Sequence, residues 1–264
     1  EYIKHHMAHL ASAHQGSVVD FSIVNYDTIF FSVLMLAVMF FLLRAGAKKA
    51  TSGVPGKMQC AVEMLVEMVD TQAKGIIHGD RSWIAPLALM VFVWVTLMNA
   101  VDLIPVDWVT GVNQLLGAFG VHVPHHRAVA TADLNGTFGM SFAVLVLMIY
   151  YSFKIKGAGG FAHELLSAPF GAKWYLAPFN LILNIVEWLS KPISLAMRLF
   201  GNMFGGEIVF LLIWVLGGAG IVGMLGGAAF GLGWMLFHLL VIPLQAFIFM
   251  MLSIVYLSLS EDAH

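Results

Sequence analysis

The chain has 264 residues, of which 60% are hydrophobic and 11% charged, and its formal net charge is −2. Soluble proteins carry about 25% charged residues, and several apolar runs in this chain approach or exceed the roughly 20 residues that cross a bilayer. These features exclude a soluble domain, the alternating pattern of a membrane barrel is missing, and the near-neutral charge does not indicate a nucleic-acid partner. The composition predicts an all-α polytopic membrane protein in which residues 1–264 form a single membrane domain.

The first apolar run, at 21–43, predicts a membrane span. The next helical pattern, at 57–77, cannot cross a bilayer because Glu63, Glu67 and Asp70 interrupt it. These acids recur at i, i+4 and i+7 and therefore share one face of the helix. The pattern predicts an amphipathic helix that lies at the membrane surface.

Apolar runs at 83–103 and 137–153 predict two further spans. A nearly continuous helical pattern then covers 176–216, which would be roughly 60 Å long, about twice the thickness of the hydrocarbon core. Such a helix must tilt steeply, bend at Pro192 or divide into two. A Gly-rich stretch leads to a last helix at 234–259. The sequence therefore predicts about five membrane-embedded helices plus the amphipathic one, with a long, steeply tilted helix pair at the C-terminal end.

Lysine and arginine are distributed unevenly between the predicted connections. Placing residues 44–82, residues 154–175 and the C-terminus in the cytoplasm puts nine of the 13 basic residues there, as the positive-inside rule requires. We therefore expect the polar segment 1–20, in which no signal sequence is visible, to be periplasmic, and the amphipathic helix to lie at the cytoplasmic surface. Lys191 and Arg198 lie inside an apolar segment and need a separate explanation.

One face of the predicted helix 176–216 is polar. At roughly 100° per residue, it carries a stripe of polar or small residues within about 40° of Arg198: Asn180, Asn184, Glu187, Lys191, Ser194, Asn202 and Gly205. Glu207 lies on the opposite face, and the last helix carries His238 and Gln245 on one face. Because an arginine at mid-membrane costs about 3 to more than 10 kcal/mol, these residues predict a water-filled cavity or a partner.

Several of these residues also fit an ordinary structural explanation. Glu187 and Lys191 are four residues apart and fit a helical ion pair near the interface. Ser194 and Asn202 fit polar contacts between packed helices. His238 fits a hydrogen-bonded core histidine. Both the structural and the functional interpretation remain open for these five positions.

Arg198 has no such explanation within its own helix, because no acidic residue stands three or four positions away from it. Its counter-charge must therefore come from elsewhere in the fold or from another chain. Arginine keeps its proton and is a fixed charge, whereas carboxylates and histidine relay protons. A fixed cation flanked by titratable groups is typical of a gated proton path.

These segments resemble a known family. SKPISLAMRLFGNMFGGEIVF (190–210) and HLLVIPLQAFIFMMLSIVYLSL (238–259) are similar to the signature segments of subunit a of bacterial F-type, proton-translocating ATP synthases, and NAVDLIPVD (99–107), TADLN (131–135) and FKIKGAGGF (153–161) match in the same order. The resemblance covers nearly the whole chain. It implies a stator subunit with two offset proton half-channels and an essential arginine, which couple proton flow to rotation of the c ring.

The resemblance also implies roles for single residues. Arg198 corresponds to the essential arginine that faces the c ring, and Gln245 and Ser194 correspond to residues near it. The family often has a glutamate at the position of Asn184, lining the cytoplasmic exit. Because Asn184 is neutral, we expect Glu187, one turn later on the same stripe, to take this role.

The remaining correspondences concern the periplasmic half-channel. Glu207 and His238 match its polar pair, Asn202 matches an asparagine that lines it, and Asp102 matches an acid at its mouth. The resemblance places the proton path in these residues and requires neither a cofactor nor a metal.

The resemblance implies no catalytic site in this chain, which has no P-loop GxxxxGK[ST]. Expected partners are the c ring, the b subunits of the peripheral stalk, the remaining ATP synthase subunits, protons and the lipid bilayer of the bacterial inner membrane, with the C-terminus in the cytoplasm. A sodium-coupled synthase is the nearest alternative. A b-type haem protein would need paired histidines at mid-membrane, and a secondary transporter would need inverted repeats with broken helices; the sequence has neither pattern.

Overall fold

The protein is all-helical in the part of the chain that the computed structural model describes, which is residue 12 and residues 24–48, 50–51, 53–77, 82–104, 128–171 and 173–261. The elements are α2 (Tyr26–Lys48), α3 (Lys57–Ile76), α4 (Ile84–Ala100), the short 3₁₀ helices η1 (Val101–Leu103) and η2 (Ala130–Ala132), α6 (Leu134–Ser167), α7 (Ala177–Gly217) and α8 (Gly220–Glu261). Except for Ser12, the predicted periplasmic segment 1–20 lies outside the described residues.

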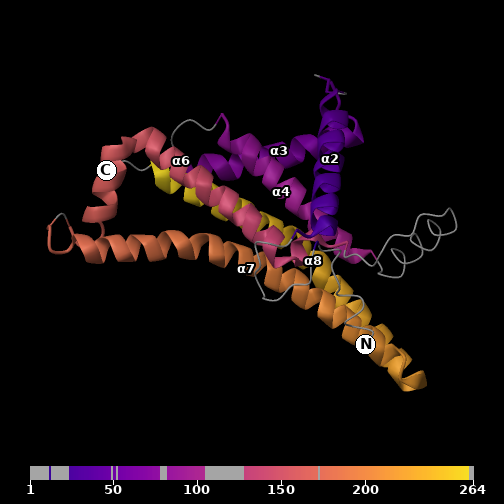
Figure 1. Cartoon of the computed structure of the whole chain (residues 1–264). Coiled ribbons are helices and arrows are strands. Elements are labelled where there is room, and N and C mark those ends of the chain that lie inside the picture. Colours follow the sequence, from indigo (N-terminus) through magenta and orange to yellow (C-terminus); the bar gives the residue numbers. More distant parts are fainter. Residues whose placement is uncertain are drawn as a thin grey trace.

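Five of these helices are long and apolar enough to cross a membrane, namely Tyr26–Lys48, Ile84–Leu103, Leu134–Ser167, Ala177–Gly217 and Gly220–Leu259. This finding confirms the predicted fold class of an all-α polytopic membrane protein. In Figure 1, α6, α7 and α8 form an elongated group, and α2, α3 and α4 pack along one side of it. The long α7 and α8 form the C-terminal helix pair that the sequence predicts.

Helix α3 is the amphipathic element. It buries Val69 and Ala73 in the core shared with α4 and α8, whereas the side chains of Glu63 and Glu67 are exposed. Asp70, the third acid of this helix, pairs with Lys74 one turn later, with 2.5 Å between Nζ and Oδ2. The spacing of the acids therefore indicated the exposed face correctly.

Helix α8 is longer than the sequence predicts. It begins at Gly220 and not near residue 234, because the Gly-rich stretch after α7 is helical. A side chain on Gly227 would place its Cβ 3.0 Å from the Cα of Gly217 and 3.3 Å from the carbonyl oxygen of Ile213. Glycine is needed here because the backbones of α7 and α8 approach too closely for a larger residue, which is a common way for membrane helices to pack.

Helix α6 also extends further than the predicted span 137–153. It continues to Ser167 through a kink at Gly157, which has φ 69° and ψ 169°. Glycine adopts positive φ without the steric penalty that other residues pay. Beyond the kink the helix turns back, so that the Nζ of Lys156 meets both carboxylate oxygens of Glu164, at 2.9 and 2.8 Å.

Helix α7 remains one helix of 41 residues although Pro192 lies inside it. It changes direction along its length in Figure 1, as helices that contain proline commonly do. Its buried face carries Leu195, Leu199 and Met203, which belong to the same apolar core as Ala246 of α8. This packing fixes the rotation of α7, and so decides which way its polar stripe faces.

Candidate functional site

The polar stripe of α7 divides into parts with different surroundings. In its middle, Arg198 is half-buried, and Ser194 and Asn202 are exposed. The Asn202 amide donates to the backbone oxygen of Arg198 at 2.9 Å. Among the described residues no acidic group lies within 4.0 Å of the Arg198 guanidinium. The chain therefore presents this cation on α7 without an ion-pair partner in its described part.

The first turns of the stripe hold the connection between α6 and α7. The Asn184 amide donates to the backbone oxygens of Leu165 at 3.0 Å and Ala168 at 2.8 Å. Asn180 donates in the same way to Leu166 at 2.8 Å. The last carbonyl groups of a helix need such donors. The Asn184 amide nitrogen is thus used to cap α6, which a glutamate, having only acceptor oxygens, could not do.

Glu187 forms an ion pair with Lys191, with 2.9 Å between Oε1 and Nζ. The Lys191 ammonium also lies 5.9 Å from the ring centre of Trp188 and 5.7 Å from that of Tyr256. The structure therefore contains the helical ion pair that the i, i+4 spacing of Glu187 and Lys191 predicts. The Glu187 side chain is nevertheless 61% exposed, so pairing leaves it accessible to solvent or a partner.

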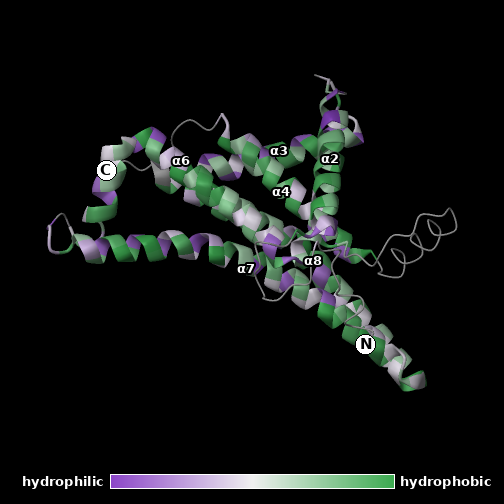
Figure 2. Cartoon of the chain, viewed as in Figure 1, coloured by the Kyte–Doolittle hydropathy of each residue, from purple (hydrophilic) through white to green (hydrophobic). Residues whose placement is uncertain are grey.

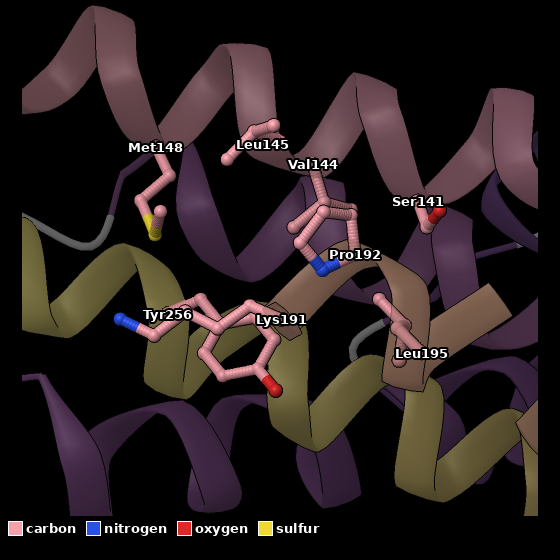
Figure 3. Close-up of a pocket in the computed structure, with 8 residues that line it drawn as sticks. All are labelled: Ser141, Val144, Leu145, Met148, Lys191, Pro192, Leu195 and Tyr256. Carbon is pink, nitrogen blue, oxygen red and sulfur yellow. The ribbon is translucent and has the colours of Figure 1, made fainter. Parts of the chain in front are cut away.

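Lys191 lines a small pocket between α6, α7 and α8, together with Ser141, Val144, Leu145, Met148, Pro192, Leu195 and Tyr256. Figure 3 shows Lys191 and Tyr256 side by side at this pocket, opposite the side chains of α6. Apart from Ser141, Lys191 and Tyr256 the lining is apolar. The pocket therefore holds the stem of Lys191 and offers no second charged group to a ligand.

His238 of α8 and Asp102 of η1 form a buried pair. The His238 Nε2 and Asp102 Oδ2 atoms are 2.6 Å apart, and the two side chains are 1% and 4% exposed. The direction of approach is not that of a regular hydrogen bond, because both atoms lack a hydrogen-bond partner by geometry. We regard the pair as a close electrostatic contact, since the distance is short and both groups are withdrawn from solvent.

Gly206 of α7 makes room for this pair. A Cβ on Gly206 would overlap the His238 ring, lying 2.9 Å from each of its nitrogens. The Trp234 indole donates to the Gly206 carbonyl oxygen at 3.3 Å, and Phe210 packs edge-on against the imidazole. The absence of a side chain at Gly206 is therefore what lets His238 lie against the backbone of α7.

Two further residues of the predicted site are buried, one on α7 and one on α8. Glu207 follows Gly206 directly and is 8% exposed, and Gln245, two turns after His238, is also 8% exposed. Gln245 and Arg198 are not joined by a hydrogen bond within the described part of the chain. The structure thus brings Asp102 and His238 into contact and joins Asn202 to the backbone of Arg198.

The sequence reasoning missed three further residues whose polar side-chain atoms are buried: Asn99, Thr131 and Asn135. The side-chain atoms of Asn99 and Asn135 and the hydroxyl of Thr131 have no hydrogen-bond partner. An asparagine inside the apolar run of α4 was the signal that could have indicated Asn99, because such residues are costly in a membrane.

The chain is similar in sequence to known proteins over its whole length. A family model described as "ATP synthase A chain" matches residues 29–258. The chain is 51% identical to "ATP synthase subunit a" of Paracidovorax citrulli (strain AAC00-1), and the match covers 100% of this chain and 96% of that relative. It is 49% identical to "ATP synthase subunit a 1" of Methylococcus capsulatus and 48% identical to "ATP synthase subunit a" of Shewanella sp. (strain MR-4), with 100% of this chain and 95% and 96% of those relatives covered. The chain belongs to the ATP synthase A chain family.

Proposed function

We propose that this chain is the stator subunit that conducts protons between two offset half-channels and the c ring of a bacterial ATP synthase. The observation that carries the proposal is a set of nine buried side-chain atoms that have no hydrogen-bond partner in the described part of the chain, on Asn25, Asn99, Asp102, Thr131, Asn135 and His238. Asp102 lies in η1, which contacts α4 and α8, and Thr131 lies in η2, which contacts α2, α4, α6 and α7. Figure 2 shows hydrophilic colouring in this region, at the lower end of α2 in that view.

Water in this region would satisfy those atoms. A buried polar atom without a partner costs about 1–3 kcal/mol, and buried waters typically make about three hydrogen bonds to such atoms. An array of this size is best satisfied by several waters in contact with one another. Connected waters beside His238 and Asp102 would supply a path for protons, and the unsatisfied atoms support the proposed half-channel in this way.

Protons would enter past Asp102 and His238, whose 2.6 Å contact offers two titratable groups in sequence. Glu207 and Asn202 on α7 would continue the path toward the surface that carries Arg198. The proton would then pass to a carboxyl group of a c subunit. Each proton that moves down a potential of 100 mV releases about 2.3 kcal/mol, which would drive rotation.

Arg198 would keep the two half-channels separate. Its guanidinium has no acidic partner in the described part of this chain, so it is available to a carboxylate on a partner. A fixed positive charge repels a free proton and stabilises an ionised carboxylate that passes it in a medium of low polarity. Ser194 and Gln245 would flank it.

We place the exit at Glu187, which is exposed although it pairs with Lys191. Asn184 would support this exit indirectly, by holding the turn between α6 and α7. Because lysine and arginine are enriched on this side, we propose that it faces the cytoplasm, with the multi-pass chain in the bacterial inner membrane. The b subunits of the peripheral stalk and the remaining synthase subunits complete the proposed set of partners.

Thiol labelling tests the half-channel. Single cysteines at positions 202, 207 and 238, in a chain whose Cys60 is replaced, should react with a water-soluble reagent in vesicles that contain the assembled complex. The control is position 146, because Val146 is 62% exposed on the outer face of α6 and should face lipid. If positions 202, 207 and 238 are as unreactive as position 146, no aqueous half-channel exists here.

Arg198→Ala tests the coupling role. It should abolish ATP synthesis and ATP-driven proton pumping while the subunit remains in the membrane. Pumping at the rate of the unchanged protein would show that the fixed charge is not needed.

A further inference from the structure

A buried hydrogen-bond network beside the proposed proton path joins the start of α2 to the start of α6. The Asp133 Oδ2 atom accepts from the Asn25 amide at 2.9 Å and from the Thr28 hydroxyl at 2.8 Å. All three residues are buried, at 5%, 5% and 8% exposure for Asp133, Asn25 and Thr28. A buried carboxyl group with two such donors from a distant segment makes a strong and geometrically specific link.

Asp133 also acts on its own side of the link. Its Oδ1 atom accepts from the backbone N–H of Asn135 at 3.0 Å, so that Asp133 is the N-cap of α6. Gly136 then permits α2 to approach, because a Cβ there would lie 2.9 Å from the Thr28 Cγ2 atom and 3.2 Å from the carbonyl oxygen of Ala130. The Asp133 carboxyl group therefore joins the start of α2 to the start of α6, where Gly136 and Thr28 are closely packed.

This link borders the polar region of the proposed half-channel. Asp133 directly follows η2, and η2 contacts α2, α4, α6 and α7. Thr131, in the middle of η2, is fully buried, and its hydroxyl has no hydrogen-bond partner. Asn135, two residues after Asp133, has two such atoms. Thr131 and Asn135 therefore flank Asp133 along the chain.

We propose that Asp133 is a positioning residue for the periplasmic half-channel: by binding Asn25 and Thr28 it fixes η2 and the start of α6 so that Thr131 and Asn135 form one wall of the hydrated region. The first turn of α2 is then part of the proton entry, and α2 is more than a membrane anchor. This inference rests on the proposed function, because it assigns a wall to the same half-channel. Asp133 itself does not carry protons in this scheme, since both of its oxygens already accept hydrogen bonds from fixed donors.

The test measures how fast a cysteine at position 131 reacts with a water-soluble thiol reagent, in assembled complex whose Cys60 is replaced. Thr28→Val removes one donor, and Asp133→Asn replaces the oxygen that accepts from Asn25 and Thr28 with an amide donor while keeping an oxygen for the N-cap. In each variant the wall opens more often, and we expect labelling at position 131 to accelerate about ten-fold, the size expected when a local opening loses a hydrogen bond to a charged acceptor. Passive proton flux through the membrane sector should fall in the same variants.

Two comparisons separate this role from general damage. Thr96→Val removes a hydroxyl that donates only to its own helix, to the backbone oxygen of Phe92 at 2.7 Å, and it should leave both measurements unchanged. The reciprocal exchange, Asn25→Asp combined with Asp133→Asn, restores a carboxyl–amide pair and should return labelling and flux to within about two-fold of the unchanged protein, because asparagine is also a good N-cap.

Labelling in Thr28→Val and Asp133→Asn at the rate of the Thr96→Val control would overturn the proposal, as would a reciprocal exchange that behaves like Asp133→Asn alone. The labelling rate does not depend on proton transport. If the unchanged complex carries no proton flux, the proposed function fails, whereas the rate at position 131 still decides whether Asp133 holds the wall.

Discussion

Replacing Gly206 with alanine tests how closely α7 must approach the buried histidine. The new methyl group would overlap the His238 ring and lie 2.9 Å from each ring nitrogen, whereas ordinary contacts between heavy atoms are about 3.5–4.0 Å. The ring is enclosed by Phe210 and Trp234, so it cannot move away freely. It would have to give up its 2.6 Å approach to Asp102.

The expected loss follows from that contact. Displacing a group by about 1 Å from the position that a reaction needs can slow that reaction about 100-fold. If the Asp102–His238 pair lies on the entry path, Gly206→Ala should slow proton flux about 10- to 100-fold. ATP-driven acidification of vesicles with the assembled complex measures pumping, and passive flux after removal of the catalytic sector measures the path alone.

Gly231→Ala is the matched control for the same helix interface. Its new Cβ would meet the Ile213 side chain at 3.5 Å, an ordinary contact, and pumping should be unchanged. If Gly206→Ala pumps at the rate of Gly231→Ala, the position of His238 against α7 does not matter to transport. The reasoning about the entry path would then be wrong, although the role of Arg198 would be unaffected.

Three further substitutions test other parts of the site. Arg198→Lys keeps the charge but loses the planar fork that binds carboxylates, so coupled synthesis should be strongly impaired; normal synthesis would show that charge alone is enough. Glu187→Gln should slow passive proton flux if Glu187 lines the exit, whereas full flux would leave only its ion pair with Lys191. Asn184→Leu removes two hydrogen bonds to the end of α6 and should lower the free energy of unfolding by about 1–3 kcal/mol, measured by denaturant titration of the full chain. Ser190→Ala, which removes a hydroxyl bonded only within α7, is its control and should change stability little.

Asn184→Glu in a Glu187→Gln chain is a related test. If only the position of the acid on the stripe mattered, this exchange would restore flux by returning an acid to the exit. In the folded chain this side chain donates to two backbone carbonyl groups. A glutamate would place its acceptor oxygens against these carbonyl oxygens, which are also acceptors. We therefore expect the double variant to loosen the α6–α7 turn and to recover no flux.

The amino-acid sequence by itself determined the class of the protein, its spans and its polar stripe. This was possible because crossing a bilayer imposes a local requirement: each span needs about 20 apolar residues whatever its neighbours are, and an ionisable residue among them is conspicuous. The same reasoning placed the acids of α3 on the exposed face and marked Arg198 as a cation without a partner in its own helix.

Only the tertiary structure decided which polar residues meet. The approach of His238 to Asp102, the link from Asp133 to α2, and the use of Asn184 as a cap all join segments that are distant along the chain. The tertiary structure also decided that the Gly-rich stretch before residue 234 is helical. Glycine has a low helix propensity when a helix is considered alone, and it is accepted there because the neighbouring helix approaches to within 3.0 Å of where a side chain would begin. Periodicity describes one helix at a time, whereas these contacts depend on how two helices pack.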